Sequence, residues 1–105
     1  MTKKINILGT QYDYIESSSK EHEDLMESDG LHYGFEKKIK IDITACDSAP
    51  QSKDEYIKKV KRHELIHAFF YESGCAKQHR DEELVDWIAY QFPKMLAAFK
   101  EVDAI

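Results

Sequence analysis

The sequence lacks the features that mark secreted or membrane-spanning proteins. It has only two cysteines, Cys46 and Cys75, and no C-x-x-C pair. We expect both to be free thiols in a reducing compartment. No stretch approaches the roughly 20 apolar residues of a membrane span, and the basic start of the chain has no apolar run long enough for a signal peptide. We therefore expect a cytoplasmic protein that does not contact a membrane.

The chain also has fewer basic than acidic residues. Among the 105 residues, 15 are Lys or Arg and 20 are Asp or Glu, which gives a net charge of −5. An acidic chain is poorly suited to gripping phosphate backbones, so no nucleic-acid partner is expected. The basic cluster within 58–62 is interpreted as the solvated face of a helix. The length suits one modest core, and we expect residues 1–105 to form a single domain.

Alternation of apolar and polar residues predicts strands in the first part of the chain. Segment 4–14 contains such a pattern, with a candidate bend at Gly9, and segments 31–35 and 38–43 continue it. Asp29-Gly30 has the composition of a turn. The fold class expected from these segments is α+β, with a small, mainly antiparallel sheet of about three strands. A short helix is expected from 19 to 26.

Two helices are predicted in the second half. Ser52 with Glu55 three residues later forms a capping-box pattern, and Gly74 is a typical end signal. Asp81 can cap a second helix that runs to about residue 100 and that Pro93 should kink. Its expected core face consists of Leu84, Val85, Ile88, Phe92, Met95, Leu96 and Phe99. Trp87 is expected in the core beside the candidate site described next.

The first of these helices contains His63-Glu64-Leu65-Ile66-His67, the pattern H-E-x-x-H. Helical residues four apart lie on one face, so His63 and His67 can aim two imidazoles at one point. Two neutral imidazole nitrogens suit a zinc ion. Glu64 can reach a water on the open side of that ion and act as general base. The pattern therefore predicts a zinc site with a carboxylate base beside it.

A catalytic zinc usually has a third protein ligand. The best candidate is Glu82, with Glu83 as the alternative, because both open the second helix. Asp86, one turn beyond Glu82, could accept the spare N–H of a ligating histidine and fix its tautomer. Glu72 points away from the two histidines along the first helix, and His79 does not have the spacing of the longer three-histidine pattern.

The run R-H-E-L-I-H-A-F-F-Y-E-S-G, followed by D-E-E-L-V-D-W-I-A, resembles small phage- or prophage-type zinc metallopeptidase domains. More broadly it is similar to ImmA/IrrE-like and other gluzincins. The resemblance covers about residues 61–92. It implies a minimal zincin-like fold, zinc on His63, His67 and Glu82, Glu64 as base and Asp86 behind the ligands. It also implies an edge strand, either 38–43 or the strand beside it, that holds a peptide by β-augmentation.

The resulting hypothesis is a zinc metallopeptidase that acts on a protein or peptide substrate. The alternative is a zinc-containing protein-binding module without proteolytic activity, used for example in phage–host control. A third possibility is a structural scaffold without metal. The residue that would stabilise an oxyanion stays open among His32, Tyr33, Tyr71 and His79, and the sequence leaves substrate identity and oligomeric state open.

Overall fold

The first 42 residues form one four-stranded sheet in the computed structural model, which describes residues 1–105. The strands are β1 (Thr2–Ile7), β2 (Thr10–Ser17), β3 (Gly30–Tyr33) and β4 (Lys38–Asp42). Their order is β1-β2-β4-β3, with β2 and β4 parallel and the other two pairs antiparallel. The α+β class is confirmed. The expected count of about three strands is wrong, because the sheet has four. Two of its three pairings are antiparallel, as expected, and the parallel pair β2–β4 makes the sheet mixed.

The extra strand comes from a tight turn inside segment 4–14. Leu8 and Gly9 both have positive φ, 51° and 95°, and they join Ile7 to its partner Thr10. Positive φ at both central residues is the geometry of a two-residue hairpin turn whose twist matches that of its strands. Leucine rarely adopts a positive φ. The sequence therefore predicted only a bend at Gly9, whereas the chain reverses direction there and forms a hairpin.

Strand β3 is an edge of the sheet and β4 lies inside it. Of the two candidate edge strands, segment 38–43 is therefore wrong and the strand beside it has that position. Gly30 is the first residue of β3 and not part of a turn. The expected helix over 19–26 is reduced to a single 3-10 turn, Glu23–Leu25, whose Leu25 is buried.

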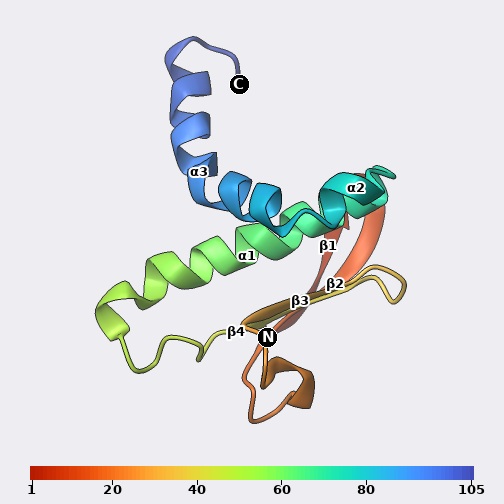
Figure 1. Cartoon of the computed structure of the whole chain (residues 1–105), viewed down its shortest axis with the longest axis vertical. Coiled ribbons are helices and arrows are strands. Elements are labelled where there is room, and N and C mark those ends of the chain that lie inside the picture. The colour runs from red at the N-terminus through yellow and green to blue at the C-terminus, as the bar shows by residue number, and fades with distance from the viewer.

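Helix α1 (Pro50–Glu72) lies across one face of the sheet (Figure 1). The predicted Ser52 cap is wrong. The helix begins two residues earlier, at Pro50, and Ala49 in the N-cap position makes no side-chain bond. The ring of Pro50 already has the φ that a first helical residue needs and lacks the N–H that would go unpaired there. Proline thus starts the helix and Ser52 lies inside its first turn.

The predicted end of α1 at Gly74 is confirmed. Gly74 has φ 74°, its N–H bonds to the carbonyl of Tyr71 (3.1 Å), and the N–H of Cys75 bonds to the carbonyl of Phe70 (2.9 Å). These two bonds define a Schellman motif, which needs a left-handed residue that glycine supplies at little cost. The sharp stop lets a short helix, α2 (Ala76–His79), turn the chain back toward α1.

Helix α3 (Glu82–Glu101) follows, and the predicted cap is confirmed because Asp81 accepts the N–H of Leu84 at 3.0 Å. Pro93 lies inside this helix, and Figure 1 shows α3 changing direction part-way along its length. The first part of α3 runs beside α1, whereas the last part stands away from the rest of the molecule. A proline removes one backbone bond and crowds the preceding turn, which accounts for a bend.

Two buried clusters hold these layers together. The larger joins the sheet to α1 and consists of Ile7, Tyr12, Tyr14, Ile39, Ile41, Ile57, Val60 and Ala68. The smaller joins α1 to α3 through Ile66, Val85 and Ala89. The predicted core face of α3 is thus correct near Val85 but wrong at Phe92 and Phe99, which are exposed. Trp87 is also not a core residue, since it is 55% exposed.

Both cysteines are free thiols, as expected. None of the helices combines the length and the apolar character that a membrane span requires.

Candidate metal centre

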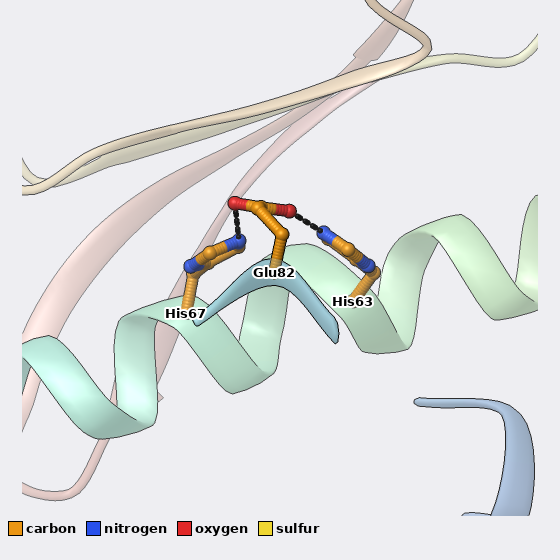
Figure 2. Close-up of side chains that lie close together, drawn as sticks. All are labelled: His63, His67 and Glu82. Carbon is orange, nitrogen blue, oxygen red and sulfur yellow. Dashed lines mark hydrogen bonds and ion pairs between the residues drawn. The ribbon is translucent and has the colours of Figure 1, made fainter. Parts of the chain in front are cut away.

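Three side chains from two helices converge on one point, as Figure 2 shows. His63 and His67 project from the same face of α1, one turn apart, and Glu82 projects from the first turn of α3. Nε2 of His63 lies 3.0 Å from one carboxylate oxygen of Glu82, and Nε2 of His67 lies 2.8 Å from the other. The Asp81 cap sets where α3 begins and so places Glu82 opposite the two imidazoles.

This group could hold a metal ion, because one ligand atom from each residue lies within 4.8 Å of the others. The carboxylate already contacts both imidazole nitrogens, so small side-chain rotations bring all three donors around a common centre. Glu83, the alternative third ligand, is exposed and does not belong to the group. The structure thus brings together the three residues that the sequence proposed as ligands.

Asp86 lies behind His63, on the opposite side of the ring from Glu82. Its Oδ1 lies 3.1 Å from Nδ1 of His63 and 3.0 Å from Nζ of Lys59. The hydrogen bond from Lys59 holds the pKa of Asp86 below its usual range, and the bond with His63 adds to this effect. A carboxylate at that distance accepts the Nδ1–H of His63 and leaves the Nε2 lone pair directed at the centre.

Glu64 lies between α1 and the edge strand β3. The residue is only 8% exposed. This burial raises the pKa of Glu64 to about 7, and the negative charge of Glu82 adds to the effect, whereas His63 and Lys59 oppose it. A carboxyl group with a pKa near neutrality can both accept and donate a proton at physiological pH. Glu64 is not in the metal-holding group, so its oxygens are available for such transfers.

Strand β3 approaches Glu64 closely because Gly30 has no side chain. A Cβ on Gly30 would lie 2.8 Å from Cγ of Glu64 and 2.9 Å from Cγ1 of Val60, closer than carbon atoms normally approach. The glycine therefore allows the backbone of an edge strand to lie directly on the buried carboxylate.

Two of the four oxyanion candidates, His32 and His79, lie beside His67, and a third, Tyr71, lies against both of them. The ring of His32 is stacked on that of His67 with centroids 6.3 Å apart, and it meets the edges of the Tyr71 and His79 rings at 5.4 and 5.3 Å. The fourth candidate, Tyr33, lies elsewhere, because its hydroxyl donates to Asp24 at 2.6 Å.

A chain of hydrogen bonds that no sequence pattern predicted orients His32. Lys37 donates to Glu72 at 2.7 Å, and the hydroxyl of Tyr12 donates to the same carboxylate at 2.6 Å. The oxygen of Tyr12 then accepts Nε2–H of His32, at 3.1 Å. Burial, followed by the neighbouring His79 and His67, lowers the pKa of His32 to about 4, so its ring is neutral at pH 7. No local pattern marks these residues, because they come from distant elements.

The candidate ligands, Glu64, Asp86 and two of the oxyanion candidates, His32 and His79, open into one cleft. Its 15 lining residues include all five predicted site residues, together with Asp29, Gly30, Leu31 and His32 at the sheet edge. Only three lining residues are hydrophobic: Leu31, Tyr56 and Val60. The cleft is thus polar, with an edge strand along one wall and the candidate metal centre on the other.

Comparison with models of known protein families, with curated proteins and with solved structures found no match for this chain. The case for a function therefore depends on the geometry of the cleft.

Proposed function

We propose that this chain is a minimal zincin-like, zinc-dependent metallopeptidase. One observation carries the proposal. A buried carboxylate outside the metal-holding group, Glu64, lies beside two histidines and a glutamate that can hold a metal, and all four open into a cleft walled by an edge strand. These are the parts that metal-assisted hydrolysis of a peptide requires.

The donor set favours zinc. Two imidazoles and one carboxylate form a common set for catalytic zinc, with a fourth position left for water. Calcium and magnesium prefer oxygen ligands. A zinc ion held there would supply a Lewis acid and lower the pKa of a bound water.

Glu64 is the proposed general base. With its pKa near 7 it can accept a proton from the attacking water and return it to the leaving amine. Its burial against β3 keeps it close to a peptide held on that strand.

Strand β3 is the proposed substrate holder. As an edge strand it has unpaired backbone groups that can extend the sheet by one peptide strand. Gly30, Leu31 and His32 line the cleft, so a peptide paired with β3 would run past the centre. Because few lining residues are apolar, we expect binding through the backbone more than through an apolar side chain.

His79, which lines the cleft, is the better candidate for stabilising an oxyanion. His32 uses its Nε2–H on Tyr12 and is neutral, so its Nδ1 offers the cleft an acceptor and not a donor. Tyr71 is exposed, and its ring contacts those of His32 and His79, but it is not among the residues that line the cleft.

The polar cleft also suits the alternative, a module that holds a partner strand without cutting it. Metal analysis combined with a peptide-library cleavage assay separates the two. We expect about one zinc per chain, lost in a His63→Ala/His67→Ala variant. Glu64→Gln should keep the zinc and abolish cleavage, and Glu83→Gln, a neighbouring carboxylate outside the group, should change neither. Cleavage that persists in Glu64→Gln would exclude the peptidase mechanism.

A further inference from the structure

Helix α3 carries one apolar stripe with the heptad spacing of helix pairs. Its members are separated alternately by three and four residues: Val85, Ile88, Phe92, Met95, Phe99 and Val102. This spacing places the five that lie within α3 on one face of the helix, as the a and d positions of a seam between two helices, and Val102 follows directly after its last turn. A stripe of this kind is stable in water only when a second surface covers it.

Only the first part of this stripe is covered within the chain. Val85 is completely buried against α1, together with Ala89. Beyond the bend, Phe92, Phe99 and Val102 are 39, 40 and 74% exposed. Figure 1 shows this part of α3 standing away from α1 and the sheet. The stripe thus continues past the point where its partner ends.

The last part of α3 has little packing to stabilise it within the chain. No residue from 92 to 101 is buried, although all are helical. Isolated helices shorter than about 12–15 residues are marginal in water, and most helices in proteins depend on packing of an apolar face. A partner surface that covers the apolar stripe would therefore stabilise the last part of α3.

The chain as a whole exposes more surface than a compact chain of its mass. The accessible surface is 6994 Å², whereas a compact chain of 12.3 kDa is expected to expose about 6,100 Å². The radius of gyration, 14.3 Å, likewise exceeds the roughly 13 Å expected for this length. The excess of about 900 Å² is close to the roughly 800 Å² that each partner buries in a stable interface of standard size.

We propose that this stripe is a homodimer interface, in which the part of α3 beyond Ala89 pairs with the same part of a second copy. A two-fold pairing covers both stripes at once and closes the assembly, so no further copy is needed. The cleft uses only Glu82 and Asp86 of α3, both before the bend. The dimer therefore leaves the cleft open, and this inference does not depend on the metal or on the proposed activity.

Sedimentation velocity and light scattering over a range of protein concentrations test the proposal, with and without added zinc. We expect a dimer with a dissociation constant on the order of micromolar or tighter. Phe99→Glu buries an unpaired charge twice in a two-fold interface and should weaken dimerisation by roughly 100-fold or more. The control is Ala97→Glu, which adds the same charge about 200° around the helix and should leave the dimer intact.

Val102→Glu provides a second disruptive variant, since Val102 is exposed in the single chain and its replacement leaves the fold of the chain intact. A wild-type chain that stays monomeric at concentrations on the order of 100 μM, well above such a constant, would overturn the proposal. Open-ended oligomers, or an Ala97→Glu variant that dissociates as readily as Phe99→Glu, would overturn it as well.

Discussion

Gly30 shows how one missing side chain shapes the cleft at the residue scale. The edge strand lies on Glu64 because nothing projects between them. Gly30→Ala forces Glu64 or β3 to move, and overpacking of this kind typically costs about 1–3 kcal/mol. We expect peptide cleavage to fall at least about 10-fold while zinc is retained, because Gly30 does not contact the ligand group.

A double-mutant cycle checks this prediction. In a Glu64→Ala background the space beside Gly30 is larger, so Gly30→Ala should then cost less stability than it costs in the native chain. Equal costs in both backgrounds, measured by urea unfolding, would show that the contact with Glu64 is not the cause.

The hydroxyl of Tyr12 connects His32 to Glu72, and Tyr12→Phe removes it. The Nε2–H of His32 then loses its acceptor within the protein. We expect a loss of about 1–3 kcal/mol in the free energy of unfolding and a change in the tautomer of His32 that ¹⁵N NMR can detect. Tyr14→Phe is the control. It removes another buried hydroxyl of the same strand, one that donates to Glu16, so it should leave the His32 signals unchanged.

The same chain of bonds predicts a response to acid. Hydrogen bonds from Lys37 and Tyr12 hold the pKa of Glu72 below its ordinary value of 4.5. A depressed pKa in the folded state contributes stability that is fully present above pH 4.5 and is lost as the pH falls through the folded value. We therefore expect Glu72→Gln to lower stability at pH 7 and to lose less than the native chain on acidification, as measured by thermal unfolding. An unchanged acid dependence would contradict this assignment.

At the scale of elements, local signals predicted the helices better than the sheet. The end of α1 at Gly74 and the start of α3 at Asp81 were correct because each depends on bonds within a few residues. The ladder between β2 and β4 joins segments far apart in the chain, and no short pattern announces a parallel pairing. The start of α1 was wrong because two signals, Ser52 and Pro50, competed within one turn.

Asp81 connects an element boundary to the metal centre. Asp81→Ala removes the bond to the N–H of Leu84 and should cost about 1 kcal/mol of stability. Because Glu82 is the first residue of α3, fraying of this turn should also weaken zinc binding several-fold, within the 10–100-fold range seen for residues that orient ligands. Competition with a chromophoric chelator measures the affinity. Glu83→Ala, in the same turn but outside the cap and the ligand group, should leave it nearly unchanged.

At the scale of the whole molecule, the candidate centre joins α1 to α3. A metal that binds only the folded chain stabilises it, by about 4 kcal/mol when free metal is 1,000 times its dissociation constant. We expect a chelator to lower the melting temperature of the native chain and to leave that of the His63→Ala/His67→Ala variant unchanged. A native chain that is insensitive to chelation would support the third possibility, a scaffold without metal.

Some residues of the candidate site could be predicted from the sequence and others could not. His63, Glu64 and His67 lie within one helix, so spacing alone placed them on one face. Glu82 and Asp86 follow after a short connection, which limited the choices. His32 lines the cleft, whereas Tyr12 and Lys37 support it from behind. The three come from separate parts of the sheet region, so only the folded chain brings them together.

The position of β4 inside the sheet has a consequence for the order of folding. The β1–β2 and β3–β4 hairpins each close a short loop, whereas the parallel pairing of β2 with β4 must close a much longer one. We expect the two hairpins to form first and the pairing of β2 with β4 to form late. The hydrogen bond between Tyr12 and His32 joins the two hairpins, so His32 takes its final position in the cleft only when β2 pairs with β4. Helix α1, which carries the histidine pair, can therefore form before the cleft is complete.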